Sequence, residues 1–127
     1  MSDDDDVLID TDVFIDHLRG AHRLKPPAGR VAYSSVTRCE LFAGRRIDED
    51  VIRTLLEPFH EIPVDREVAE PAGRIRRDHD VRTPDALIAA TAILNGLTVW
   101  TNNVGDFRAV AGLKVRSPRA QSPRAGT

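Results

Sequence analysis

Four acidic residues occupy positions where surface acids are uncommon, each after an apolar strand-like run or within an apolar helix-like segment. They are Asp10, Glu40, Asp85 and Asp106. Two carboxylates about 4 Å apart repel by roughly 4 kcal/mol at an effective dielectric near 20, so several in one pocket need protons or a bound cation. An all-oxygen ligand set suits Mg²⁺ or Mn²⁺, and such an ion at a strand edge is typical of sites that handle phosphate.

Each acid also has a purely structural explanation. Asp12 is equally suited to capping the helix that follows the first strand. Asp85 fits the favourable electrostatics of a helix N-terminus, and Asp106 fits a turn. Glu40 has an ambiguous helix register, because its neighbours predict two different inward faces, and Asp16 is expected to face solvent. Only the convergence of several acids at one place favours chemistry.

Apolar periodicity predicts strands that alternate with helices. The expected strands are residues 7–9, 30–34, 60–64, 97–101 and 113–115, and the expected helices are residues 13–18, 35–44, 48–58, 65–75 and 83–95. Pro63 marks the third strand as an edge strand. Pro71 is expected to kink the fourth helix, and Thr83 is expected to cap the fifth. The alternation predicts a mainly parallel sheet with helices on both faces, whose ligands bind at the carboxyl ends of the strands.

Composition limits the class of protein. The chain has 127 residues and a formal net charge of −2. That length predicts one domain, expected over residues 1–116, while residues 117–127 contain Ser-Pro-Arg-Ala twice and are expected to be a disordered tail. Near-zero net charge argues against non-specific coating of nucleic acid but allows a local phosphate-binding patch. The candidate phosphate contacts are Arg38, Arg45, Arg46, Arg82 and Arg108.

Cys39 is the single cysteine, which excludes a disulfide framework and a cysteine-based metal site. We expect it to be a small buried residue. No apolar run approaches the length of a membrane span, so no membrane partner is expected. The start of the chain also lacks a signal-peptide pattern, which makes the cytoplasm the default location.

Four segments in order resemble a known family: "VLIDTDVFIDHLRG", "YSSVTRCELFAG", "TPDALIAATAILNGLTVWTNNVGDF" and "GLKV". Together they resemble a PIN-domain ribonuclease, specifically a VapC-type toxin of bacterial toxin–antitoxin systems. The resemblance covers about residues 7–115. It implies a three-layer α/β/α fold with a central, mainly parallel sheet, and Mg²⁺- or Mn²⁺-dependent endonucleolytic cleavage of RNA. It also implies a homodimer that a cognate antitoxin neutralises.

The resemblance also implies roles for single residues. Four acids match the family's catalytic and metal-binding positions: Asp10, Glu40, Asp85 and Asp106. Thr11, Thr101 and Asn103 match positions that support the site. Asp12 falls where relatives often carry serine or asparagine, so it is interpreted as a supporting residue or an extra ligand. The Ser-Pro-Arg-Ala tail and Pro71 have no counterpart that we can assign.

Other classes are weaker alternatives. "DTDVF" has the Asp-x-Asp form of haloacid-dehalogenase-like phosphatases, which also need a later lysine, and neither Lys25 nor Lys114 is well placed. A response-regulator receiver domain needs a phospho-accepting Asp after its third strand, for which Asp65 is a poor candidate. A non-catalytic RNA- or protein-binding module of the same fold is the remaining alternative. The presence of all four acids disfavours it.

Overall fold

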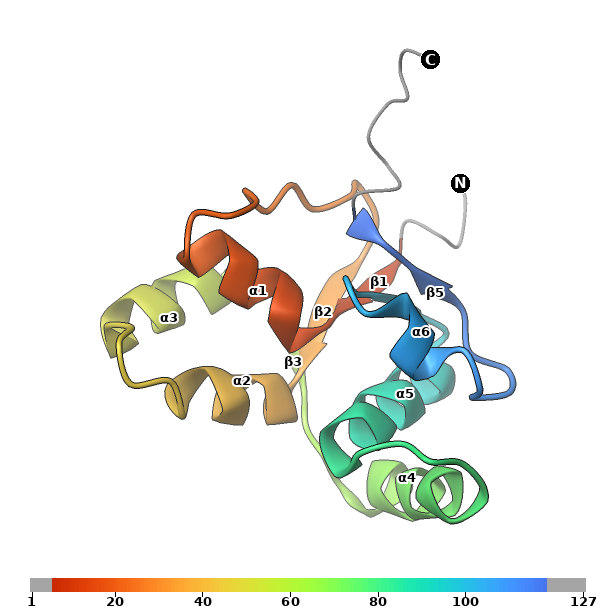
Figure 1. Cartoon of the computed structure of the whole chain (residues 1–127). Helices are drawn as coiled ribbons and strands as arrows, with labels where there is room; N and C mark the ends of the chain where they lie inside the picture. The colour runs from red at the N-terminus through yellow and green to blue at the C-terminus, as the bar shows by residue number, and fades with distance from the viewer. Residues whose placement is uncertain (1–5, 119–127) are drawn as a thin grey trace, which may run out of the picture.

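Five parallel strands form one sheet in the order β3-β2-β1-β4-β5 in the computed structural model, which describes residues 6–118 (Figure 1). The strands are β1 Val7–Ile9, β2 Val31–Ser34, β3 His60–Ile62, β4 Thr98–Trp100 and β5 Val115–Arg116. Every pairing is parallel. The most apolar strand, β1, lies at the centre, and β3 lies at an edge directly before Pro63, as predicted.

Helices cover both faces of this sheet, so the predicted three-layer α/β/α fold is confirmed (Figure 1). They are α1 Thr11–Leu18, α2 Ser35–Phe42, α3 Glu49–Leu56, α4 Arg66–Asp78, α5 Thr83–Asn95 and α6 Val104–Phe107. Figure 1 shows α1, α2 and α3 together on one side of the sheet and α4, α5 and α6 on the other. No helix in the described part of the chain is long and apolar enough to cross a membrane.

Two apolar cores follow from the alternation of side chains along the central strand. Val7 and Ile9 pack with Phe14 of α1 in the core beneath α1–α3. Leu8, which points to the opposite face, packs with α4 and α5 in the second core. Because β1 is buried on both faces, the residue that follows its last position is the first that can reach the edge formed by the carboxyl ends of the strands.

Pro71 lies inside α4, which continues on both sides of it, and Val68 and Ala72 are buried against the second core. Two local expectations are wrong. Thr83 does not cap α5, because the backbone oxygen of Arg82 already accepts the first helical bond, from Ala86. Cys39 is exposed, since the inward face of α2 carries Thr37 and Leu41 instead. The expected tail lies mostly outside the described residues.

Candidate active site

The end of the central strand places Asp10 in a buried position. Asp10 follows β1 directly and is the N-cap of α1, where its Oδ1 accepts a hydrogen bond from the Thr11 backbone N–H at 2.8 Å. Its other oxygen, Oδ2, accepts from the Thr101 hydroxyl at 2.8 Å. Asp10 is only 6% exposed. Both carboxylate oxygens are therefore held from two adjacent strand ends, and Asp12 is not the cap of this helix.

A chain of hydroxyl groups connects α1 to Glu40 on α2. The Thr11 hydroxyl donates to Oε1 of Glu40 at 2.6 Å. That donation uses the single hydroxyl hydrogen of Thr11, so the buried Thr37 hydroxyl, 2.9 Å away, must donate to Thr11. The Glu40 carboxylate is thereby directed toward the end of β1. This contact resolves the helix register that the sequence left ambiguous.

Asp12 holds the loop that follows β4. Its Oδ2 accepts from the Asn103 side-chain N–H at 2.7 Å and from the Asn102 backbone N–H at 3.2 Å. The side-chain N–H of Asn102 donates to Oδ2 of Asp16 at 2.8 Å. The loop is closed further by the Asn103 backbone N–H, which donates to the Thr101 hydroxyl at 3.0 Å. Asp16 is therefore half-buried and bonded rather than simply facing solvent, which corrects the sequence-based expectation.

Asp85 approaches the same edge from the opposite face of the sheet. It lies in the first turn of α5 and is 7% exposed. The guanidinium of Arg82, one turn earlier, lies 3.5 Å from Oδ2 of Asp85, while the Arg82 side chain itself is 76% exposed. Burial raises the pKa of Asp85, the charge of Arg82 lowers it, and the charges of Asp106 and Glu40 raise it.

Asp106 is the most open member of the group. It is exposed on the short helix α6, where its backbone N–H donates to the Asn103 carbonyl at 3.0 Å. Its connection to the other acids is electrostatic, through its effect on the pKa of Asp85. The structure therefore brings all four predicted acids within electrostatic reach of one another, but it fixes them to very different degrees.

Burial and the negative charges of neighbouring acids raise the pKa values of Asp10 and Asp12. The pKa of Asp10 rises from 3.8 to about 7, chiefly because the carboxyl is buried and then because of the charge of Asp12, with a smaller contribution from Asp85. The hydrogen bonds from Thr101 and Thr11 oppose this rise. Burial also raises the pKa of Asp12. A divalent cation would relieve each of these penalties, and the donor set consists of the hard oxygens that Mg²⁺ and Mn²⁺ prefer.

The side chains are not already gathered into a coordination sphere. Within residues 6–118, no three Asp, Glu, His or Cys side chains lie close enough together to hold a metal ion. A cation at this edge must therefore draw the carboxylates inward. The residues present fit a hard cation by their chemistry and charge.

Sequence reasoning missed two contributors, Thr37 and Asn102. Thr37 precedes Glu40 by one helical turn, and that spacing is the signal that could have identified it. Asn102 lies between two predicted residues and connects Asp12 to Asp16. Arg38, a candidate phosphate contact, is instead paired with Glu61 at 2.8 Å and donates to the Tyr33 hydroxyl at 2.9 Å.

The chain is a parallel α/β/α sandwich in which two buried acids, Asp10 after the central strand and Asp85 on α5, lie near the carboxyl ends of the strands, where ligands bind in folds of this class. The PIN domain family model matches residues 7–113, and this chain belongs to that family.

Known relatives agree with this assignment. The chain is 37% identical over 121 residues to Ribonuclease VapC10 from Mycobacterium tuberculosis, covering 85% of this chain and 90% of the relative. It is 31% identical over 118 residues to Ribonuclease VapC1 from Methanocaldococcus jannaschii, covering 86% and 85%. Among solved structures, a toxin–antitoxin complex from Klebsiella pneumoniae superposes with a TM-score of 0.75 at 31% identity, covering 88% of this chain and 97% of that one.

Proposed function

We propose that this protein is a VapC-type toxin, an Mg²⁺- or Mn²⁺-dependent endoribonuclease that a cognate antitoxin neutralises. Membership of the PIN domain family and the ribonuclease relatives support the RNA substrate. One observation supports the metal dependence best: Asp10 is buried at the end of the central strand, with its pKa raised to about 7 by burial and by neighbouring acids. A carboxyl group so placed is only partly ionised at neutral pH, and a bound cation would favour its charged form.

In this proposal Asp10, Glu40, Asp85 and Asp106 hold the ion. An ion held by these residues would supply charge neutralisation at the scissile phosphate and would lower the pKa of an attacking water. The chain's other polar groups position the ligands. Thr11 orients Glu40, and Thr101 orients Asp10. Supporting hydrogen bonds of this kind commonly change metal affinity or activity by about 10–100-fold.

Asp12 has a positioning role in this mechanism. It holds the Asn102–Asn103 loop, and so it controls where α6 presents Asp106. Arg82 is the candidate phosphate contact that lies nearest the acids, since its guanidinium is beside Asp85 and its side chain is exposed. A phosphate oxygen and the Asp85 carboxylate would compete for this guanidinium, and metal binding to Asp85 would free it for the phosphate.

A purified-protein assay tests the reaction. Total RNA is incubated with the protein in Mg²⁺, in Mn²⁺ and in EDTA, beside Asp85→Asn and the matched control Asp78→Asn, which alters an exposed acid on α4. We expect discrete fragments that need the metal, at least about a 10²-fold loss in Asp85→Asn, and full activity in Asp78→Asn. Equal cleavage by both variants would remove Asp85 from the site. Cleavage in EDTA would contradict the metal dependence.

The toxin assignment has a separate test. We propose that the protein acts in the cytoplasm. Induced expression of the chain alone is expected to arrest cell growth, and expression of the Asp85→Asn variant is expected to leave growth unaffected. Arrest by the folded Asp85→Asn variant would mean that toxicity does not depend on cleavage.

We also propose a homodimer, supported by the exposed apolar side chains of Ile93 and Leu94 on α5. Light scattering of the purified chain measures its mass, and a monomer at micromolar concentration would contradict the dimer.

A further inference from the structure

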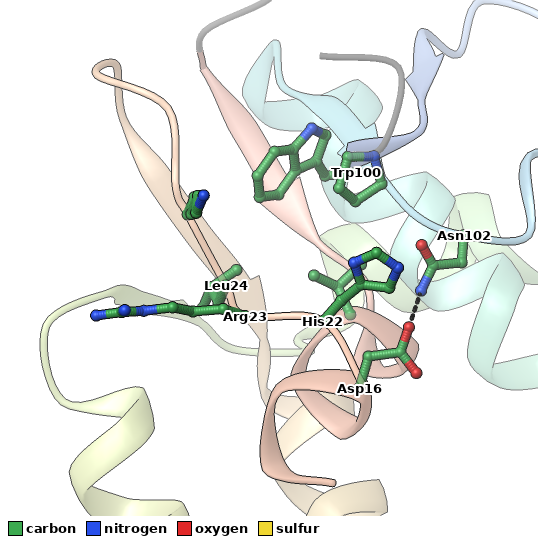
Figure 2. Close-up of a pocket in the computed structure, with 9 residues that line it drawn as sticks. Asp16, His22, Arg23, Leu24, Trp100 and Asn102 are labelled. Atoms are coloured by element: carbon green, nitrogen blue, oxygen red, sulfur yellow. Dashed lines mark hydrogen bonds between the residues drawn. The ribbon is translucent and has the colours of Figure 1, made fainter. Parts of the chain in front are cut away.

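A separate pocket opens beside the acids, on the α1 side of β4 (Figure 2). Its volume is about 230 Å³. Its lining residues come from α1, from the loop after α1, from the end of β4, and from the segments that follow β4 and β5: Val13, Asp16, His22, Arg23, Leu24, Lys25, Trp100, Asn102 and Pro118. None of the four proposed metal ligands is among them. The pocket is therefore a neighbour of the acidic edge and not part of it.

The loop that forms one wall is held in place by specific hydrogen bonds. The backbone N–H groups of Ala21 and His22 both donate to the Asp16 carbonyl, at 2.9 and 3.3 Å. Further along, the Leu24 backbone N–H donates to Nδ1 of His17 at 2.9 Å. Gly20 makes the reversal possible, because its φ of +76° is costly for residues with a side chain. These hydrogen bonds fix the backbone of the wall, in which Leu24 is partly buried against the core and His22, Arg23 and Lys25 are exposed.

Asn102 joins the pocket to the acidic edge. Its backbone N–H donates to Asp12, and its side-chain N–H donates to Asp16, as the dashed line in Figure 2 shows. One side-chain N–H of Asn102 is used by Asp16, which leaves the second N–H to donate to a ligand and the amide oxygen to accept from one. A ligand in the pocket would therefore be separated from the acids only by this residue and Asp12.

The lining combines apolar contact with positive charge. Val13 and Trp100 are buried and provide apolar surface. His22, Arg23 and Lys25 are exposed and surround the opening with cationic or potentially cationic groups. This combination suits a flat, partly apolar ring that is attached to an anionic backbone. RNA bases that are splayed out of a single strand are recognised in this way, by stacking and by hydrogen bonds to their edges.

We propose that this pocket binds one unpaired nucleobase of the RNA, next to the phosphate that lies at the acids, and so helps to select the cleavage site. This inference rests on the proposed ribonuclease function. The volume is below the range of about 300–1,000 Å³ typical of drug-sized ligands, which favours a single base. The amide of Asn102 can both donate to and accept from the edge of such a base. A basic peptide is disfavoured, because Arg23 and Lys25 would repel it.

Trp100 provides a direct reporter, because it is the single tryptophan of the chain and it lines the pocket. The full chain is titrated without divalent ions with AMP, GMP, CMP and UMP, and with ribose 5-phosphate, while Trp100 fluorescence is followed. We expect a saturable change that differs among the four bases and is weak for ribose 5-phosphate. His22→Ala is expected to weaken binding of the preferred nucleotide by about 10-fold, the scale of one lost stacking contact.

His60→Ala is the matched control, because His60 is also exposed but lies on the edge strand β3. It is expected to leave the titration unchanged. The same variants are then compared with Mg²⁺ on total RNA by sequencing the fragment ends. His22→Ala is expected to relax the base preference beside the cut, while His60→Ala keeps the pattern. Melting curves check that both variants are folded.

The outcomes separate this inference from the proposed function. Metal-dependent cleavage with identical fragment ends in His22→Ala and the wild type would overturn the pocket's role and leave the ribonuclease intact. Equal fluorescence responses to ribose 5-phosphate and to all nucleotides would mean that only phosphate is bound, which also overturns it. A base-dependent response in a protein that cleaves no RNA would overturn its role as a substrate subsite. Binding of a basic peptide but of no nucleotide would assign the pocket to a protein partner instead.

Discussion

The two sides of the acidic edge are built differently. On the α1–α2 side, Asp10, Asp12 and Glu40 each accept hydrogen bonds from groups on other segments of the chain. On the α5–α6 side, Asp85 has the exposed Arg82 beside it, and Asp106 is itself exposed and acts on Asp85 through its charge. We call these the bonded side and the open side.

This difference suggests a division of labour. Hydrogen bonds to a carboxylate stabilise its charged form and fix its direction before any ion arrives. The bonded side can therefore act as a rigid half-site. The open side has fewer constraints, and no gathered ligand set exists within residues 6–118, so some carboxylates would have to move to hold the proposed ion. Asp85 and Asp106 are the acids whose side chains are constrained by the fewest hydrogen bonds to other segments.

The largest expected effect is the pH dependence of stability on the bonded side. The pKa of Asp10 is about 7 in the folded chain and near 3.8 when unfolded. Between these values the folded state binds more protons, so the free energy of unfolding decreases as pH rises. From pH 5 to 7.5 the metal-free protein is expected to lose on the order of 2–3 kcal/mol from this group. Urea unfolding in EDTA at several pH values measures it.

Asp10→Asn is the control for that experiment. The amide has nearly the same shape and does not titrate, so the pH dependence is expected to flatten. Adding Mg²⁺ or Mn²⁺ at pH 7.5 should restore stability to the wild type and not to Asp10→Asn, because ion binding displaces the proton. Stability that is constant or rises over this pH interval in the metal-free wild type would contradict the buried, raised-pKa Asp10.

The next effect is the loss of the loop anchor on the bonded side. Asp12→Ala removes the acceptor of the Asn102 backbone N–H and of the Asn103 side chain. We expect a loss of about 1–2 kcal/mol, less than the full value of charged hydrogen bonds because the buried charge is also removed. Urea unfolding at pH 7 measures the change. An unaltered free energy of unfolding would show that the loop is held by other contacts.

A smaller effect is expected from the hydroxyl chain. Thr37→Val keeps the side-chain shape but removes the donor to Thr11, at a cost of about 1 kcal/mol and about a 10-fold loss of cleavage as Glu40 loses its support. Thr91→Val is the matched control, because Thr91 is equally buried but donates only to the Leu87 carbonyl of its own helix. It should lose similar stability and keep its activity. Equal activity in both variants would rule out a role for the Thr37 hydroxyl.

The sequence predicted the parts of the site that depend on local pattern. The buried run Val7–Ile9 followed by Asp10 was sufficient to place an acid at the sheet edge, because a strand buried on both faces has only its end free. Pro63 likewise marked an edge strand, since proline cannot donate to a neighbouring strand. Cys39 shows that residue type alone does not predict burial. Cysteine is commonly buried, but Cys39 lies on the face of α2 that is turned away from the core.

The remaining parts depend on contacts between distant residues. The direction of Glu40 is set by Thr11, 29 residues earlier, and Asn102 reaches Asp16 across 86 residues. No local periodicity encodes such pairs, and so Asp16 was predicted to face solvent. The pocket was missed for the same reason, because residues 13–25 form it together with Trp100, Asn102 and Pro118 from the other end of the chain.

The smallest effect on stability is expected on the open side, from Asp106→Ala. Asp106 is exposed, and hydrogen bonds to Asp12 and Thr101 already close the loop that leads to it. Its removal is therefore expected to change the free energy of unfolding by no more than about 0.5 kcal/mol. Cleavage is nevertheless expected to fall by about 10–100-fold, because one of the four proposed ligands is lost.

Asp12→Ala and Asp106→Ala thus form a matched pair of Asp-to-Ala changes on the two sides of one edge. Isothermal titration with Mn²⁺ and urea unfolding, run on both, give two numbers for each. The bonded-side change should mainly lower stability, and the open-side change should mainly lower Mn²⁺ affinity. If Asp106→Ala were as destabilising as Asp12→Ala, α6 would depend on Asp106 for its fold and the two sides would not differ. If Asp106→Ala bound Mn²⁺ and cleaved RNA like the wild type, the ion would be held by Asp10, Glu40 and Asp85 alone.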